Sequence, residues 1–396
     1  MRTMAVWLAL AALIASGWVG AAPARGEEQT ELQRLKQQVG ELQGRIQQLE
    51  EAQQKEAEAR KLAEASKKEA EAKKVEPVQA GFGKIKLDGL VQVWGTADSK
   101  AADTFRVRRT EIKFSGEATP RLKWAVMFDP SKSLSQTTDK TIVQSSRPLQ
   151  DAILSWALSK QAQLDIGQYK VPTSEEGMRS SAQLDTIERS MISVRGKWGD
   201  IRDVGLMVRG AFQQGEYQVG VFNGEGQNVT DVSDRKDVAG RVVLKPKSAP
   251  GLELGLSTYQ GKRGAAEVTN RRTGGELRFR RDPWVLKAEY MTGRDSVSTS
   301  SLSDRAGWYV LGGYSLDPKR QLVARYDVWD PGTDVSGDRE SDLLLGMNWF
   351  LEKHNAKFQL NLVRKSFQTG AAAGLAGYPS DTRHVNQLLT NFQVAF

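Results

Sequence analysis

Basic side chains recur at every second residue in many parts of this chain, so that positive charge is repeated along single faces of it. Lys84 and Lys86 alternate with apolar residues in KIKL, and Arg278 and Arg280 alternate with them in ELRFRR. Residues two apart share one face of a β-strand. A face with fixed positive charge attracts anions and repels cations without making or breaking a bond. The spacing therefore indicates selection of solutes by charge.

Bond-making chemistry has few candidate residues. The chain has no cysteine, which excludes disulfides, thiolate metal sites and cysteine nucleophiles. Its two histidines are His354, in the turn-like EKHN, and His384, in the last long link, so we expect them at opposite ends of the fold. No GxSxG, HExxH or P-loop motif accompanies them. The sequence predicts no enzyme, no metal site and no cofactor.

The basic excess lies in one part of the chain. The formal net charge is +8, and residues 1–80 contain as many acidic as basic groups, so the whole excess belongs to residues 81–396. A basic domain suggests anionic partners. Nucleic acid is disfavoured as a partner because the chain lacks a localised basic and aromatic patch and carries an export signal, described below.

From residue 81 onward, apolar and polar residues alternate. In KIKLDGLVQV, apolar side chains such as Leu87 and Val91 share one face, and polar ones such as Lys86 and Gln92 share the other. The pattern repeats about sixteen times, ending in NFQVAF, and many short strands in series are typical of a sandwich or a barrel. The links decide between them, because turn-like links such as GEATPR and QQGE alternate with longer ones. Longer links are expected near Arg263 and Ser298 as well.

Short turns at one rim and long loops at the other are typical of a bacterial outer-membrane barrel. We therefore predict an all-β fold: an antiparallel transmembrane β-barrel of about sixteen strands over residues 81–396, wide enough for a water-filled lumen. The last strand places Phe392, Val394 and Phe396 on the lipid side. A terminal aromatic residue resembles the signal by which such barrels are recognised for assembly, and we assign that role to Phe396.

Alternate side chains of a strand face the lumen and the lipid. We assign the basic residues to the lumen, because an Arg or Lys facing lipid at mid-membrane costs about 2–4 kcal/mol. Because Arg108 and Arg109 are adjacent, we expect one of them to leave the lumen for a rim or subunit contact. The alternative is that the inward charges pair across neighbouring strands and leave the pore neutral. The predicted anion pathway consists of Arg109, Lys113, Lys123, Arg209, Arg241, Arg278, Arg280, Lys287 and Arg325, with Arg179 and Arg189 from the longest loop.

The first eighty residues have a different character. Residues 1–24 read as a secretory signal peptide, with an apolar run followed by Ala22-Pro23-Ala24. Residues 25–80 are predicted to form an α-helical periplasmic coiled coil and linker; a single charged helix or an unstructured linker is the alternative. The predicted coiled-coil seam, spaced 3, 4, 3, 4, 3, is Leu32, Leu35, Val39, Leu42, Ile46 and Leu49.

Several stretches resemble the phosphate-selective porin O and P family: FRVRRTEIKFSGEATPRLKWAVMFD, GQYKVPTSEEGMRSSAQLDTIERS, RDVGLMVRGAF and YQVGVFNGEGQN. The resemblance covers residues from about 81 to the end. It implies a trimer of sixteen-stranded barrels whose third long loop folds inward and narrows the pore. Family members that select phosphate do so with inward basic residues, especially an arginine ladder. Here Glu175 and Glu176 occupy the constriction loop, and the sequence shows no regular ladder.

Together these observations predict a passive outer-membrane porin for small hydrophilic solutes, with a modest preference for anions and phosphate as one candidate. The expected partners are outer-membrane lipid, lipopolysaccharide, small anionic solutes and two further copies of the chain. The alternative function is a structural one, in which the coiled coil ties the outer membrane to a periplasmic or cell-wall partner.

Overall fold

The computed structural model describes Gly40, Gly44, Gln47, Val78–Gln79 and residues 83–133, 147–263, 268–298 and 301–396. The chain divides into two compact units, Met1–Glu76 and Pro77–Phe396. In the first unit the three described residues are helical. The predicted signal peptide and coiled-coil seam lie outside the described residues and stay predictions. Among the described residues, no helix has the length and apolar character needed to span a bilayer.

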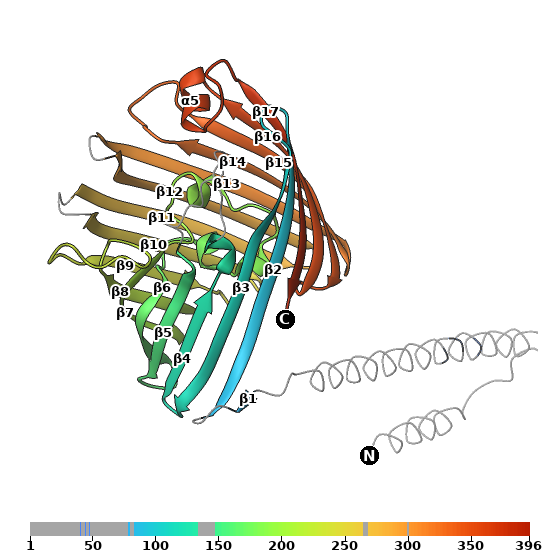
Figure 1. Ribbon diagram of the computed structural model, residues 1–396. Helices are drawn as coiled ribbons and strands as arrows, with labels where there is room; N and C mark the ends of the chain where they lie inside the picture. Colours follow the sequence, from blue (N-terminus) through green and yellow to red (C-terminus); the bar gives the residue numbers. More distant parts are fainter. Residues whose placement is uncertain are drawn as a thin grey trace, which may run out of the picture. The chain divides into compact units, whose positions relative to one another are not determined.

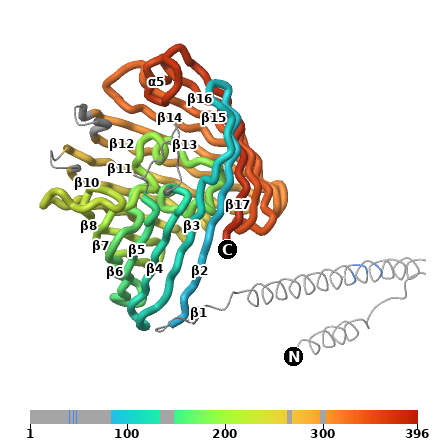
Figure 2. Tube along the Cα trace, in the orientation of Figure 1, coloured from blue at the N-terminus to red at the C-terminus, as the bar shows by residue number. Residues whose placement is uncertain are grey.

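The second unit is a closed antiparallel barrel of sixteen strands, as predicted, drawn in Figure 1 and as a tube in Figure 2. Each strand pairs with the next along the chain, and β17 pairs with β2 to close the wall. A short strand, β1 (Val78–Gln79), adds to β2. The barrel strands are β2 (Lys84–Asp98), β3 (Thr104–Thr119), β4 (Leu122–Phe128), β5 (Leu149–Ala157), β6 (Ala162–Lys170), β7 (Arg202–Phe212), β8 (Gly215–Phe222), β9 (Asp237–Leu244), β10 (Leu252–Arg263), β11 (Val268–Arg281), β12 (Trp284–Ser298), β13 (Ser301–Asp317), β14 (Arg320–Asp330), β15 (Glu340–Glu352), β16 (Ala356–Phe367) and β17 (His384–Ala395).

The two faces of the wall follow the alternation of the sequence. In β2, Leu87 and Val91 are exposed on the outer face, whereas Gln92 and Trp94 are buried on the inner face. An apolar outer face with a polar inner face is the arrangement that places lipid outside and water inside. Phe396 lies on the outer face, on the same side as Phe392 and Val394.

Short turns lie at one rim of the barrel and long loops at the other, as predicted, but two of the expected long loops are short. Short turns such as 120–121, 213–214 and 318–319 lie at one rim, and the links 129–148, 171–201 and 368–383 lie at the other. The expected long loops near Arg263 and Ser298 are wrong, because β10 to β13 continue through these residues and leave links of only 264–267 and 299–300. The cross-strand ladder continues beyond the apolar part of these strands, through polar residues that a hydropathy pattern assigns to loops.

Candidate functional site

The link between β6 and β7 folds into the barrel and narrows it. It contains α3 (Glu175–Met178), the 3₁₀ turn η2 (Ser181–Gln183) and α4 (Met191–Val194), and most of its residues are buried. We call residues 171–201 the constriction loop. Its apolar part packs on the wall, where the Trp198 ring contacts Trp329 edge-on at 5.1 Å between centroids. The inward third long loop implied by the family resemblance is therefore present.

Asp185 fastens the constriction loop to one side of the wall. Its carboxylate accepts from Lys287 Nζ at 2.7 Å and from Arg280 Nη2 at 2.8 Å, and it is almost fully buried. Its backbone oxygen accepts from Asn348 Nδ2 at 2.8 Å. Burial alone would raise the pKa of Asp185, but the Lys287 ammonium and the Arg280 guanidinium hold it well below its usual value. The loop thus brings a buried, fully ionised carboxylate to two of the predicted pore cations.

Arg325 makes a second anchor. Its Nη1 donates to Thr186 Oγ1 at 2.7 Å and to the Glu188 backbone oxygen at 2.9 Å. Its Nε lies 2.6 Å from Asp327 Oδ2 on the same strand. A buried charge with several partners of this kind holds a segment in one geometry, and removing one partner costs about 3–5 kcal/mol.

The remaining predicted cations on this side also have carboxylate partners. Arg189 lies 3.2 Å from Asp200, and Arg278 Nη1 lies 2.8 Å from Glu253. Arg179 pairs with Glu175. Arg241 pairs with Glu276, the residue on β11 that faces Glu289 of β12. Seven predicted pore residues are therefore paired at or beside the loop–wall contact: Arg179, Arg189, Arg241, Arg278, Arg280, Lys287 and Arg325.

The opposite wall leaves an open cavity of about 650 Å³ against the constriction loop. Its charged lining is balanced, because four acidic groups accompany four basic ones. Arg209 lies 2.5 Å from Asp165 at its edge, and Lys123 lies beyond the cavity, near the short-turn rim, 2.8 Å from Glu117. The charged residues that line the cavity are Asp88, Glu111, Asp151, Asp165, Lys113, Lys170, Arg202 and Arg209.

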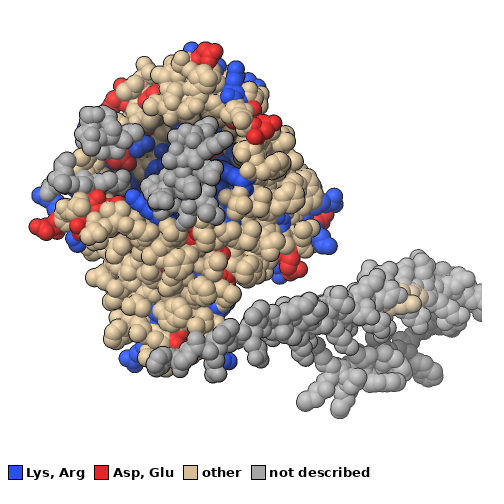
Figure 3. Space-filling view, in the orientation of Figure 1, with Lys and Arg blue, Asp and Glu red and all other residues tan. Residues whose placement is uncertain are grey.

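Three arginines of β3 gather around one tryptophan on the inner face. The guanidinium carbons of Arg106, Arg108 and Arg109 lie 5.1, 5.0 and 6.0 Å from the ring centroid of Trp94. The Trp94 side chain is 2% exposed. We call these three residues with Trp94 the arginine cluster. In the space-filling view, Lys and Arg atoms line the hollow of the barrel, with a few Asp and Glu atoms among them (Figure 3).

A β-bulge explains how adjacent arginines share the lumen. Gln92 pairs with Arg109 and Val93 pairs with Val107, so Arg108 is an extra residue in the ladder. An extra residue re-aims side chains locally. Both Arg108 and Arg109 therefore reach the Trp94 ring, and the expectation that one of them leaves the lumen is wrong.

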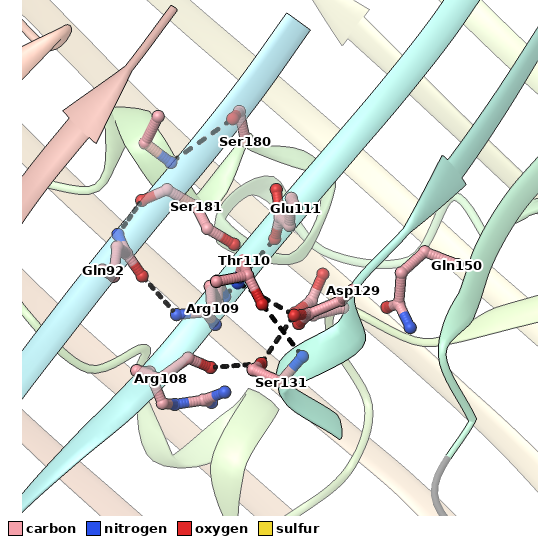
Figure 4. Close-up of polar contacts among 12 residues, drawn as sticks. Gln92, Arg108, Arg109, Thr110, Glu111, Asp129, Ser131, Gln150, Ser180 and Ser181 are labelled. Carbon is pink, nitrogen blue, oxygen red and sulfur yellow. Dashed lines mark hydrogen bonds and ion pairs between the residues drawn. The ribbon is translucent and has the colours of Figure 1, made fainter. Parts of the chain in front are cut away.

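The start of the loop after β4 holds this bulge in place (Figure 4). The buried carboxylate of Asp129 accepts from the Thr110 backbone N–H at 3.0 Å and from Ser131 Oγ at 2.6 Å. Ser131 Oγ also lies 3.3 Å from the Arg108 backbone oxygen, which can share the same hydroxyl hydrogen. These contacts satisfy backbone groups that lie beyond the β3–β4 ladder, which ends at the Ile112–Phe128 pair.

Arg109 is connected to the constriction loop through Gln92. Arg109 Nη1 donates to Gln92 Oε1 at 2.8 Å (Figure 4). Gln92 Nε2 donates to Gln393 Oε1 at 2.7 Å. Gln393 Nε2 in turn donates to the Ala182 backbone oxygen at 3.0 Å. The amide chain spans β3, β2 and β17, so it ties the arginine cluster to the loop at the place where the barrel closes.

Sequence reasoning missed Arg106, Arg108 and Trp94 as a group. The signal was present, because FRVRR places arginines two apart and then breaks the alternation with a second arginine. A break of that kind within a strand marks a bulge. The GVFNGEG motif has a structural explanation instead: the Gly224 N–H donates to buried Asp203 at 2.8 Å.

The model of the family described as phosphate-selective porin O and P matches residues 89–264 and 257–396. The chain belongs to this family. It is a porin of the outer membrane, a passive channel. Among solved structures, it is similar to the anion-selective porin from Comamonas acidovorans, with 13% identity and a TM-score of 0.58 over 79% of this chain and 100% of that one.

Two further solved structures show the same fold. One is the trimer form of OmpT from Vibrio cholerae, with 11% identity and a TM-score of 0.56 over 80% of this chain and 100% of that one. The other is OmpF of Salmonella typhi in complex with daunomycin, with 12% identity and a TM-score of 0.58 over 81% of this chain and 100% of that one. No curated protein matches the chain.

The two histidines of this porin lie apart, as expected. His354 is in the turn after β15, where its ring contacts Phe350 edge-on at 5.3 Å between centroids. Burial and the nearby Lys357 ammonium lower the pKa of His354 to about 4. His384 begins β17 at the other rim. Among the described residues, no group of His, Asp and Glu could hold a metal ion.

Proposed function

We propose that this porin prefers anions and that the arginine cluster sets the preference. The observation that carries the proposal is the concentration of three guanidinium groups around Trp94. Arg109 lies 3.5 Å from Glu111, and Glu188 of the constriction loop attracts both Arg106 and Arg109 from a greater distance. No carboxylate of the described residues lies within ion-pair distance of Arg106 or Arg108. Unneutralised positive charge on a water-filled wall attracts anions and repels cations.

The rest of the described lumen adds little charge. The cations beneath the constriction loop are compensated by carboxylates such as Asp185 and Glu253. The cavity on the opposite wall has as many acidic as basic lining groups. Selection between anions and cations requires charged side chains that no opposite charge neutralises. In the described lumen, the arginine cluster is where such side chains lie closest together.

Phosphate is a candidate solute for the same geometry. Guanidinium groups donate to phosphate oxygens in a fork that an ammonium cannot reproduce. The buried Trp94 Nε1–H has no acceptor among the described residues and would add an indole donor at the same place. We infer a moderate preference for anions in general, with phosphate among the solutes that pass.

We further propose a homotrimer, which the trimeric form of OmpT among the similar structures supports. The coiled coil over residues 25–80 would lie in the periplasm, and its role as a tether to a periplasmic or cell-wall partner stays the alternative function. We also propose that residues 1–24 are a signal peptide that directs export of the chain.

The test is a reversal-potential measurement in a KCl gradient across a planar bilayer. Wild type should favour chloride, and Arg106→Gln with Arg108→Gln should move the reversal potential toward zero. The matched control, Lys86→Gln with Lys123→Gln, removes the same charge from exposed side chains near the short-turn rim and should change the potential little. A wild-type preference for cations would overturn the proposal, as would equal shifts in both double variants.

Salt and phosphate separate a charged wall from a specific site. Selectivity by fixed charge should weaken as the screening length falls from about 10 Å at 0.1 M salt to about 3 Å at 1 M. A tight phosphate site would instead show chloride current blocked by low phosphate concentrations, and that block would persist at high salt.

A further inference from the structure

Two arginines face each other on the outer wall of the barrel. Arg271 of β11 pairs directly with Arg294 of β12, and both side chains point away from the lumen and are accessible. Like charges directly opposite in a ladder are destabilising. Arg294 lies 3.7 Å from Asp304, whereas no carboxylate of the described residues lies within ion-pair distance of Arg271. This pair therefore has a positive excess that an anion could neutralise.

A row of hydroxyl groups follows the arginine pair toward the membrane. Thr258, Thr273 and Thr292 lie side by side on β10, β11 and β12, two residues from the arginine row, and all three are exposed. Two residues of a strand correspond to about 6.6 Å. The Thr292 and Thr258 hydroxyls donate to the Arg305 and Arg272 backbone oxygens at 3.2 and 3.5 Å, so they offer a ligand their acceptor lone pairs. The Thr273 hydroxyl can both donate and accept, so the row suits the hydroxyl groups of a sugar next to the arginines.

An apolar groove begins in the next row. It has a volume of about 580 Å³. Its floor includes the small residues Gly275 and Ala288, and its sides include Tyr290 and Trp308, which pair across β12 and β13. A Cβ atom added at Gly275 would meet only Leu256, at 3.7 Å, so the floor is open. The groove is shallow and open to the outside, so a hydrocarbon chain could lie along it.

The position of these three rows along the barrel shows which leaflet of the membrane they face. They lie near the rim that carries the constriction loop and the other long links, which in outer-membrane barrels is the extracellular one. At the opposite end of the same strands, Trp284 and Tyr314 form an aromatic pair with 4.7 Å between centroids, which marks the other interface. The arginine pair therefore lies at the headgroup level of the outer leaflet.

We propose that this outer face binds a phosphorylated glycolipid of the outer leaflet. Arg271 and Arg294 would bind its phosphate, the threonine row its sugar, and the groove one acyl chain. Basic residues at a membrane interface recognise anionic lipid headgroups in this way. Charge favours lipid over a second barrel as the occupant, because another copy would have to bring a carboxylate to the same level. The proposal depends on the membrane location of the porin and is independent of the solute it conducts.

The test measures binding of purified lipid A to the detergent-solubilised full-length porin by native mass spectrometry. Arg271→Gln with Arg294→Gln should weaken binding at least about tenfold, as expected for two lost charge-assisted hydrogen bonds. Gly275→Leu should weaken it by filling the groove without changing charge. The matched control is Arg281→Gln, which removes an exposed arginine from the other end of β11 and should leave binding unchanged.

Channel conductance provides the folding control, because the arginine pair lies outside the lumen and the double variant should conduct like wild type. Phosphatidylglycerol should compete poorly, since it lacks the sugar. The proposal is overturned if the double variant binds lipid A as wild type does, or if phosphatidylglycerol competes equally. A change in oligomeric state without a change in lipid binding would also overturn it, and would assign this face to contact between copies.

Discussion

Gly89 and Phe396 exchange two backbone hydrogen bonds, 2.7 Å from the Gly89 N–H to the Phe396 oxygen and 3.0 Å in the other direction. The Phe396 ring covers Gly89 on the outer face, and a Cβ atom added at Gly89 would lie 2.3 Å from the ring. The last residue of the chain thus completes the seam between β17 and β2. Its aromatic ring requires a residue without a side chain opposite it.

Gly89→Val should therefore displace the terminal ring and destabilise the folded barrel by about 1–3 kcal/mol, as expected for overpacking. The measurement is a urea titration of the barrel in lipid vesicles. Because the two residues act on one contact, Gly89→Val should cost much less in a Phe396→Ala background. Additive effects of the two substitutions would contradict this account of the seam.

The assembly role of Phe396 predicts a separate result. Deletion of Phe396 should lower the amount of barrel in the outer membrane, because it removes two backbone hydrogen bonds and the outward ring. Phe396→Tyr should keep most of the assembly, since it retains both. Quantifying heat-modifiable barrel in isolated outer membranes checks this, and equal amounts for the deletion and wild type would show that the terminus is dispensable.

Asp129 should control the geometry of the arginine cluster. Asp129→Ala leaves the Thr110 N–H without its acceptor and should cost about 1–3 kcal/mol of unfolding free energy. It should also lower the anion preference, because Arg108 is then less firmly held beside Trp94. Ser131→Ala, which removes the hydroxyl contacts but keeps the bond from the Thr110 N–H to Asp129, should have a smaller effect on both measurements. The opposite ranking would show that the bulge does not depend on Asp129.

Asp185 predicts a particular dependence on pH. Since its pKa is depressed in the folded barrel, its stabilising contribution is complete above the unfolded-state value of about 3.9 and is lost as the pH falls toward the folded-state value. The difference in unfolding free energy between wild type and Asp185→Asn should be about 3 kcal/mol at pH 7. It should narrow as the pH falls below about 4, where the Asp185 carboxylate begins to be protonated in the unfolded chain. A difference that is as large at pH 3 as at pH 7 would contradict the role of the ionised carboxylate.

The coiled-coil seam is tested on its own segment. A peptide of residues 27–76 should be helical, with stability that rises with concentration, and Leu42→Asp should abolish its association by burying an unpaired charge. Gln38→Asp places the same charge outside the seam and is the control. Sedimentation giving a monomer at high concentration would favour a linker, and a dimer would contradict the expected trimer.

The barrel was predictable because alternation is a local property of the chain. A few alternating residues, such as Leu87 and Val91, are enough to identify the lipid-facing side of a strand. Short turns are enough to identify one rim. The charge of the lumen was not predictable in the same way, because neutralisation depends on partners far apart in sequence. Asp185 meets Arg280 and Lys287 only when the constriction loop lies on β11 and β12, so counting cations overestimated the unpaired charge near the loop.

The extra residue in β3 makes chain length, as well as amino-acid type, a determinant of pore charge. Removing Arg108 would subtract one cation from the lumen, while Val107 and Arg109 could keep their partners, Val93 and Gln92. The faces of both flanking segments would stay the same. Insertion or deletion of one residue is thus a route by which the selectivity of such a barrel can change in a single evolutionary step, without altering its strand register.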